Sequence, residues 1–353
     1  MVPNARSALT LPLSALLASL IAAGCSSGTV GQRVVPSPSL GGRTPQLRVI
    51  LDGRPLHPDV ASVTLQPNES MLLLDRASIP LVPARPHLAV RSTGEGKPVR
   101  WQAEHGTVTV EQAGLRGHAR YAAPATPGMD RLQAFSEDAP TGVLAEIVIL
   151  TVTPFDAVHA EHLGSYRIGR YPPPPDAATP YARARRSMVA GFVEVTSDNR
   201  ATRLSSHVRL RDLECKQTHA GSSRYLALDV RLLDKLERLV DLLTARGIPG
   251  TALTIMSGYR TPYYNRRIGN RTPWSRHVMG DAVDVFVDGD GDGNMDDLDG
   301  DGRVSRADAE VLLVLVDILD DDPALVGGAA AYPGTATHGP FVHLDTRGYR
   351  ARW

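Results

Sequence analysis

The sequence contains little cysteine and no excess of charge of either sign. Only two of its 353 residues are cysteines, Cys25 and Cys215, so a framework of several disulfides is excluded. The 38 Lys and Arg residues balance the 38 Asp and Glu residues, and bulk charge gives no reason to expect a nucleic-acid partner. The fold must therefore be stabilised by its core, and by metal where a site exists, over a length that accommodates two domains and linkers.

No apolar run is long enough for a comfortable membrane span, but the first residues are typical of a targeting segment. An apolar run over 9–21 is broken by Pro12 and is followed by Ala22-Ala23-Gly24-Cys25. This ending resembles the lipobox of bacterial lipoproteins, where cleavage leaves the cysteine first and acylated. The resemblance implies a signal peptide over 1–25, lipidation at Cys25, and a location at the cell envelope facing the periplasm. Membrane contact would then occur through this anchor only; the alternative is a plain cleaved signal peptide with an incidental Cys25.

Two low-complexity segments divide the rest of the chain. Residues 26–45 are rich in Ser, Gly and Pro and predict a flexible tether. Residues 155–200 include four consecutive prolines at 172–175, which predicts an extended linker between domains. Between them, residues 46–154 carry short alternating apolar runs that indicate an all-β sandwich. The stretch Arg120-Tyr121-Ala122-Ala123-Pro124, followed by Gly128, resembles bacterial immunoglobulin-like domains.

The region 201–353 mixes helix and strand signals. Residues 229–246 place leucines on one helical face and are followed by Gly247, which predicts an amphipathic helix. Strands are expected over 253–256, 282–287 and 341–344. Because these elements do not alternate regularly, the pattern predicts an α+β domain.

A carboxylate stands in the strand expected at 282–287. Asp284 is surrounded there by apolar residues, where a charge is costly unless it is paired or bound to a cation. His277 lies upstream across a turn, and His343 lies in another apolar strand. Two imidazoles and one carboxylate, with a fourth position left for water, form a typical catalytic zinc set. Taken singly, each residue is also compatible with a buried position in the core where its polar atoms are hydrogen-bonded or paired.

Three linked motifs carry a resemblance to a known family. The motifs are Ser257-Gly258-Tyr259-Arg260-Thr261-Pro262 with Asn265, then Ser275-x-His277-x-x-Gly280-x-Ala282-x-Asp284, then Phe341-Val342-His343-Leu344-Asp345. They resemble the zinc D-Ala-D-Ala peptidases of the lysostaphin, carboxypeptidase and hedgehog-domain group, over roughly residues 204–353. The resemblance implies that His277, Asp284 and His343 bind zinc, that Arg260 contacts the substrate or its scissile carbonyl, and that Ser275 orients the turn bearing His277.

The sequence departs from that family where many members place a general base. The position three residues before the last histidine is Pro340, and the position two before it is Phe341. A metal-activated water needs a proton acceptor for efficient hydrolysis. We expect Asp345 to take this role, because alternation places it on the strand face of His343, with His338 as the second candidate.

An acidic run over 288–308 predicts calcium binding. Its second part fits the twelve-residue EF-hand loop, with a final Asp as in dockerin-type loops, and predicts ligands from Asp297, Asp299, Asp301, the carbonyl of Arg303, and Asp308. The first part offers a possible second loop at Asp288, Asp290 and Asp292, which would share residues with the first. The alternative is a solvated acidic loop.

The sequence therefore predicts a zinc peptidase of the cell envelope that acts on peptidoglycan peptides, with Zn²⁺ and Ca²⁺ as cofactors. Two other functions stay open. One is a non-catalytic metal-containing module that binds the cell wall, and the other is a calcium-stabilised scaffold protein whose β domain does the binding.

Overall fold

The fold was analysed in a computed structural model, which describes residues 47–74, 88–92, 99–110, 118–136, 139–173, 189–272 and 274–353. Residues 43–353 form one compact unit. The signal peptide, Cys25 and the tether predicted for 1–45 lie outside the described residues, as do residues 174–188 of the predicted linker.

Residues 47–154 form two β-sheets, and their described part contains no helix. The first sheet has the order β2-β1-β5-β4-β8-β7 and the second β3-β10-β9-β6. The strands of the first sheet are β1 (Leu47–Leu51), β2 (Arg54–Pro55), β4 (Ser70–Leu74), β5 (Leu88–Ser92), β7 (Thr107–Val110) and β8 (His118–Ala122). Those of the second are β3 (Ser62–Leu65), β6 (Val99–Ala103), β9 (Gly128–Ser136) and β10 (Ala139–Thr151). Buried residues such as Val49, Val63 and Ile149 belong to the core. An immunoglobulin-like identity for this region stays a prediction.

The segment predicted as a linker contains regular structure at both of its ends. A short strand β11 (Thr153–Pro154) and a 3-10 turn η1 (Phe155–Ala157) lead into a hairpin of β12 (His162–Leu163) and β13 (Tyr166–Arg167). After the proline-rich stretch, β14 (Gly191–Val195) pairs with β11 and with β15 (Arg224–Leu226). The described ends of 155–200 are therefore parts of the fold rather than a free spacer.

The C-terminal region is built on a five-stranded sheet with the order β16-β17-β19-β18-β20. Its strands are β16 (Leu253–Ser257), β17 (Ala282–Val287), β18 (Gly328–Tyr332), β19 (Phe341–Asp345) and β20 (Ala351–Arg352). Neighbouring strands are antiparallel, apart from β18 and β20, which run parallel. β17 spans the residues predicted for a strand, and every one of its residues is buried.

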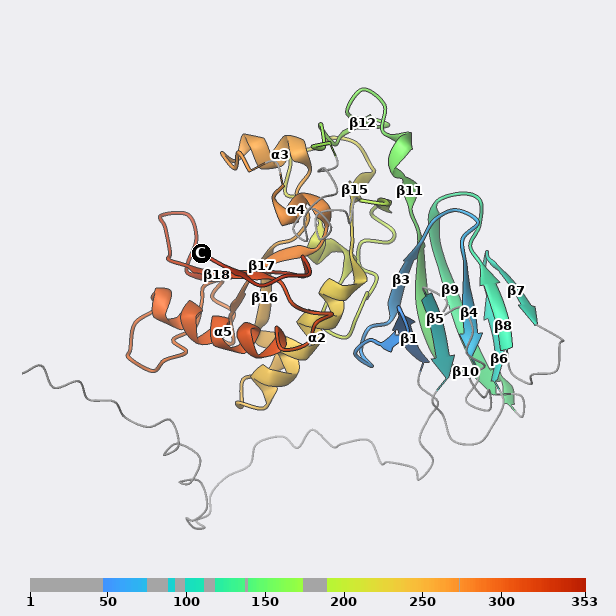
Figure 1. Cartoon of the computed structure of the whole chain (residues 1–353), viewed down its shortest axis with the longest axis horizontal. Coiled ribbons are helices and arrows are strands. Elements are labelled where there is room, and N and C mark those ends of the chain that lie inside the picture. Colours follow the sequence, from blue (N-terminus) through green and yellow to red (C-terminus); the bar gives the residue numbers. More distant parts are fainter. Residues whose placement is uncertain are drawn as a thin grey trace, which may run out of the picture. The chain divides into compact units, whose positions relative to one another are not determined.

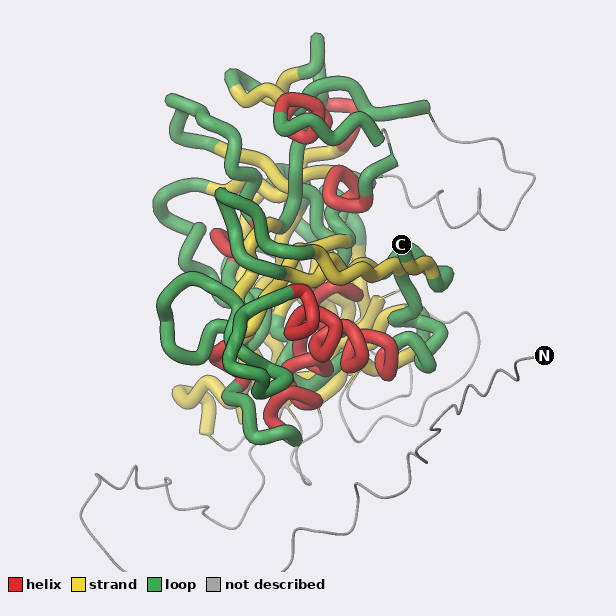
Figure 2. Tube along the Cα trace, turned by 90° about the vertical axis from the view of Figure 1, so that its left-hand side faces the viewer, coloured by secondary structure: helices red, strands yellow, loops and turns green. Residues whose placement is uncertain are grey.

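Two long helices cover one face of this sheet. They are α2 (Val230–Thr244) and α5 (Arg306–Leu319), which contact each other (Figure 1). Figure 2 shows the helices in red and the strands in yellow from a direction turned by 90°. Asp229 caps α2 by accepting a hydrogen bond from the backbone N–H of Arg231, and Ser305 with Asp308 forms a capping box at α5. The short helices α3 (Pro262–Arg267) and α4 (Arg276–Met279) lie on the other side of the sheet (Figure 1). The short 3-10 helices η2 (Leu210–Leu213) and η3 (Gly250–Ala252) precede β15 and β16.

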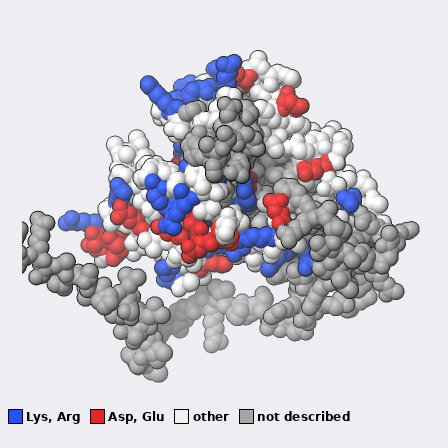
Figure 3. Space-filling model, in the orientation of Figure 1, with Lys and Arg blue, Asp and Glu red and all other residues white. Residues whose placement is uncertain are grey.

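Charged side chains of both signs are present on the surface. On the face drawn in Figure 3, basic side chains gather at the top and acidic ones lie below them. Helix α3 has two basic residues, Arg266 and Arg267, in its last turn. No helix among the described residues is long and apolar enough to cross a membrane.

Candidate metal centre

Strand pairing brings two of the predicted ligands together. In the antiparallel pair of β17 and β19, Asp284 lies directly opposite His343, so both side chains point to the same face of the sheet. The alternate residues Val283 and Leu344 are fully buried on the other face. The apolar strands therefore fix the carboxylate and the imidazole at one position on the sheet.

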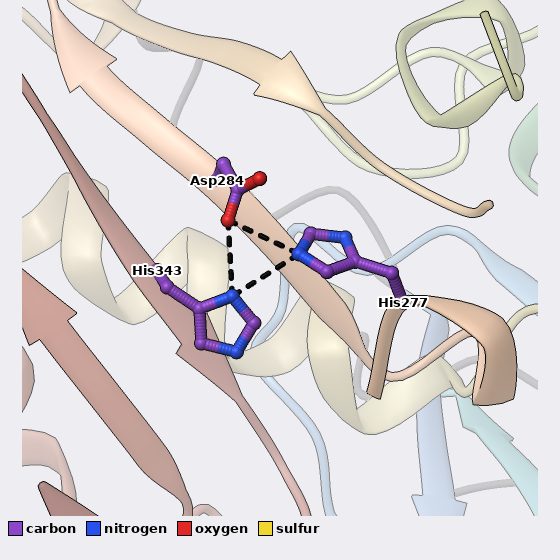
Figure 4. Close-up of side chains that lie close together, drawn as sticks. All are labelled: His277, Asp284 and His343. Atoms are coloured by element: carbon purple, nitrogen blue, oxygen red, sulfur yellow. Dashed lines mark hydrogen bonds and ion pairs between the residues drawn. The ribbon is translucent and has the colours of Figure 1, made fainter. Parts of the chain in front are cut away.

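The third ligand comes from helix α4, which precedes β17. Gly280 ends α4 with a φ of 77°, a left-handed conformation that glycine adopts without strain. A Cβ at this position would lie 2.4 Å from the backbone of Ala227, so glycine is also required by the close approach of the chain. The turn directs His277 over the sheet face that carries Asp284 and His343 (Figure 4).

Each of the three side chains directs one ligand atom toward the other two. Nε2 of His277 lies 3.1 Å from Oδ1 of Asp284 and 3.1 Å from Nδ1 of His343. Nδ1 of His343 lies 3.0 Å from the same Oδ1, which completes a triangle of ligand atoms (Figure 4). All three residues are buried.

This donor set fits zinc. Bonds of about 2.0–2.1 Å in tetrahedral geometry place neighbouring ligand atoms about 3.3 Å apart, close to the spacing observed here. Two imidazole nitrogens that face one carboxylate oxygen are also the ligand types that zinc prefers in catalytic sites. The residues that would bind the metal are therefore His277, Asp284 and His343, as the sequence predicted.

Each ligand is oriented by a further contact. Nδ1 of His277 donates to the carbonyl oxygen of Gly258 at 2.7 Å, which leaves Nε2 to face the cluster. The second carboxylate oxygen of Asp284 accepts a hydrogen bond from Nη2 of Arg260, whose Nε donates to Ser257 at 2.9 Å. Such partners fix the ring orientation and the basicity of metal ligands.

Asp345 orients the ring of His343 by a contact with its Nε2, and the carboxylate does not face the cluster. Its Oδ2 lies 3.3 Å from Nε2 of His343, on the ring edge opposite the one that approaches Asp284. The carboxylate is fully buried, pairs with the guanidinium of Arg347, and accepts the backbone N–H of Gly328 at 2.8 Å. This placement corrects the prediction that Asp345 is the general base, because an acceptor of this kind must reach the water beside the metal.

The other two predicted site residues, His338 and Ser275, do not belong to the cluster. His338 lies before β19, where its Nδ1 donates to the carbonyl of Gly339 at 2.8 Å and its ring is 5.2 Å from that of Phe341. It is not part of the metal-ligand group. Ser275 occupies the N-cap of α4, but its side chain makes no capping hydrogen bond.

Burial and mutual contacts set the protonation of the cluster. Burial raises the pKa of Asp284, but its contacts with the two histidines lower it well below its ordinary value. Burial lowers the pKa of His277. Burial also acts to lower the pKa of His343, yet hydrogen bonds and charges from Asp284 and Asp345 raise it to about 9. In the absence of metal, the cluster therefore shares protons that a cation would displace.

A pocket of about 490 Å³ opens over the cluster. Besides the three residues of the cluster, it is lined by arginines, aromatic side chains and uncharged polar side chains: Arg260, Asn270, Thr272, Trp274, Ser275, Arg276, Tyr332, Phe341, Arg347, Tyr349 and Trp353. The sequence prediction missed its aromatic residues, although Tyr349 and Trp353 follow the last motif by only a few residues.

A tyrosine far upstream also supports the site. The hydroxyl of Tyr171 donates to the carbonyl oxygen of Val278 in α4 at 2.8 Å, and it lies 2.8 Å from the hydroxyl of Tyr259. Val278 follows the ligand His277. The segment predicted as a linker thus holds the helix that bears a metal ligand, and nothing in the local sequence signalled this contact.

The acidic run forms two loops with the same hydrogen-bond pattern. Asp297 accepts the backbone N–H groups of Gly300 and Gly302, and Asp288 accepts those of Gly291 and Gly293. Ligand oxygens of Asp297, Asp299 and Asp308 lie within 4.8 Å of one another. Asp301 stands in the same loop and accepts the N–H of Arg303 at 2.8 Å.

The first loop departs from the prediction. Its close group consists of Asp288, Asp290 and Asp296, without Asp292, whose carboxylate accepts the N–H of Asn294 at 2.7 Å. Asp296, which the sequence prediction left out, belongs to this group, whereas Asp299 belongs to the group of the second loop. The two loops therefore do not compete for a carboxylate.

Comparison with known proteins supports the zinc peptidase resemblance in part. Residues 206–298 match the family model described as Peptidase M15. The matched range includes Arg260, His277 and Asp284, whereas His343 lies beyond it. No curated protein and no solved structure matches the chain. The match supports a hydrolase of the metallopeptidase class.

Proposed function

We propose that this protein is a zinc-dependent peptidase that cleaves peptidoglycan peptides at the cell envelope, as a D-Ala-D-Ala carboxypeptidase or as an endopeptidase. The observation that carries the proposal is the convergence of His277, Asp284 and His343 on one point in a pocket. Two of these residues lie in the segment similar to Peptidase M15, and the third completes the set from a strand outside it.

The chain's own residues would bind and orient the substrate. Arg260 lines the pocket, and its Nη2 and Nε are engaged by Asp284 and Ser257. Nη1 has no hydrogen bond to any described residue and is available to a carbonyl or carboxylate oxygen. Zinc, when bound, supplies a Lewis acid that polarises a carbonyl group and acidifies water.

A second function is favoured by one specific observation. Among the described residues that line the pocket, the metal ligands are the only histidines and carboxylates. A site that retains the metal but has no separate base fits a module that binds cell-wall peptides without cleaving them.

Incubation of the purified full chain with a peptidoglycan stem pentapeptide, with and without zinc, separates the two functions. The peptidase releases a shorter peptide that mass spectrometry detects, and His277→Ala abolishes both the release and the bound zinc. A protein that binds zinc and the peptide but releases no product is the wall-binding module. A chain with no zinc dependence in either assay contradicts both functions.

The calcium and envelope predictions complete the proposal. We propose that calcium binds at Asp297, Asp299, Asp301, Asp308 and the carbonyl of Arg303, because these groups stand at the ligand positions of an EF-hand loop. Since the loop begins soon after β17, bound calcium would brace the strand that carries Asp284. The lipid anchor at Cys25 would hold the protein at the envelope, and Cys25→Ser should release it from the membrane fraction.

A further inference from the structure

Tyr332 lies on the same face of the sheet as the metal ligands. In the antiparallel pair of β18 and β19, Ala330 lies opposite His343, and Tyr332 lies opposite Phe341. Tyr332 is therefore the diagonal neighbour of His343, at a Cα separation of about 7–8 Å that an aromatic side chain can bridge. Both residues line the pocket over the cluster.

The side chain of Tyr332 is held from two directions. Its ring stacks on Phe341 with a centroid distance of 4.8 Å and an interplanar angle of 8°. Its hydroxyl oxygen accepts a hydrogen bond from Nε1 of Trp353 at 2.6 Å. Trp353 is 55% exposed, and its ring in turn lies 5.4 Å from the ring of His343.

The direction of this hydrogen bond decides what the hydroxyl can do. An indole N–H is a donor only, so it occupies a lone pair of the Tyr332 oxygen and leaves the phenolic hydrogen free. The structure shows no acceptor for that hydrogen among the residues it describes. Tyr332 thus presents an oriented hydroxyl donor to the pocket.

The charged donors of the pocket are already engaged with carboxylates. Arg260 binds Asp284, Arg276 binds Asp281, and Arg347 binds Asp345. Moving Arg276 or Arg347 toward a substrate would weaken a buried ion pair, and Arg260 has only its Nη1 left to donate, whereas the Tyr332 hydroxyl can donate without breaking a contact.

We propose that Tyr332 is a catalytic residue that donates a hydrogen bond to the carbonyl oxygen of the scissile peptide bond, and that Trp353 is a positioning residue that acts through it. The proposal rests on the proposed peptidase function. The hydroxyl keeps its proton throughout and stabilises negative charge as it develops on the substrate oxygen. Phe341 and Trp353 keep the ring and the hydroxyl in place, so no reorganisation is needed when that charge forms.

The test compares Tyr332→Phe, which keeps the stacked ring, with the parent protein. We expect kcat on a stem pentapeptide to fall about 10- to 100-fold, with KM changed less than about threefold and zinc content unchanged. Tyr263→Phe is the matched control, because Tyr263 lies on α3 outside the pocket and its hydroxyl contacts Arg267. An unchanged kcat in an active parent background would overturn the role of Tyr332.

Trp353→Phe tests the positioning role by a double-mutant comparison. Alone, it should lower kcat about three- to tenfold, because the hydroxyl loses its fixed partner. Combined with Tyr332→Phe, it should add nothing, since no hydroxyl remains to be positioned. Additive losses would show that Trp353 acts by another route and would overturn that half of the proposal.

A binding assay on metal-free protein separates this proposal from the proposed function. Calorimetric titration with the same pentapeptide should show about threefold weaker binding for Tyr332→Phe and parent-like binding for Tyr263→Phe. If the zinc-loaded parent cleaves nothing, the peptidase function fails and this assay decides whether Tyr332 contacts the peptide. Equal affinities in that case would overturn the contact, as would the absence of any binding.

Discussion

Replacing the Asp345 carboxylate should weaken zinc binding rather than stop proton transfer. In Asp345→Asn, the residue beside Nε2 of His343 keeps its shape but loses its charge. The carboxylate selects the imidazole form in which Nε2 carries the proton and Nδ1 faces the cluster, with Nε2 and Oδ2 3.3 Å apart. Loss of such a partner costs about 10- to 100-fold in metal affinity, or about 1.4–2.7 kcal/mol.

The same substitution also breaks a buried ion pair, and this effect needs a control. The side chains of Asp345 and Arg347 are 0% and 15% exposed. Asp281→Asn is a matched change, because Asp281 pairs with Arg276 at 2% and 5% exposure and is not a metal ligand. Breaking a pair of this kind costs about 3–5 kcal/mol of folding free energy. Both variants should therefore lose thermal stability in the metal-free state.

Zinc affinity distinguishes the two variants. Competition with a chromophoric chelator should show a loss of about 10- to 100-fold for Asp345→Asn and a change of less than about threefold for Asp281→Asn. At saturating zinc, peptide hydrolysis by Asp345→Asn should stay within a few-fold of the parent. A loss of about 10²-fold or more under that condition would identify a general base and refute the assignment. Equal zinc affinities in the two variants would refute the orienting role.

Three further predictions follow from the site and its surroundings. Because contacts with Asp284 and Asp345 outweigh burial and raise the pKa of His343 to about 9, zinc must displace a proton, and its affinity should rise with pH up to about 9; a flat profile in chelator competition would contradict this. Tyr171→Phe removes the hydroxyl that holds the carbonyl of Val278, so zinc affinity should fall about three- to tenfold while the surface variant Tyr263→Phe is unaffected. Calcium should raise the melting temperature of the parent protein but not of Asp297→Asn with Asp308→Asn, and an unmoved parent curve would leave the loop a solvated acidic segment.

The three residues that converge in the structure could be predicted from the sequence, beginning with Asp284, which breaks a strong local pattern. β17 is apolar at every residue except Asp284, and alternation determines which neighbours share its face. The motif around His277 added the second member of the cluster, and the strand around His343 the third. Strand pairing then required only that β17 and β19 be neighbours for Asp284 and His343 to meet.

The role of Asp345 could not be predicted in the same way. Alternation correctly places Asp345 on the face of His343, since Ala282 and Asp284 of β17 pair with these two residues. A shared face does not determine which ring nitrogen a side chain approaches. That choice depends on the rotamer of His343 and on Arg347, which binds the carboxylate. The sequence pattern therefore predicted proximity but not function.

Contacts between distant segments were also beyond sequence reasoning. The proline run at 172–175 predicted a spacer, yet Tyr171 beside it is bonded to α4 across more than a hundred residues. The buried face of α5 is another case: Leu312 and Leu319 are buried, whereas Ile318 is 45% exposed. Several apolar stripes are possible on a helix rich in Val and Leu, and only packing against β18 and β19 selects one.

The pH dependence of hydrolysis should show whether a separate base exists. Pro340 has no titratable group, Asp345 is directed away from the cluster, and His338 is bonded to the carbonyl of Gly339. If the ligands are the only titrating groups at the reacting centre, activity should fall on acidification at the same midpoint as zinc content, since protons compete with the metal for His343. Zinc retention and hydrolysis measured on the same samples over a pH series test this coincidence. Loss of activity at a pH where zinc is fully retained would require another base, and His338→Gln would then be the variant to compare, because the loop before β19 could bring its ring toward the pocket.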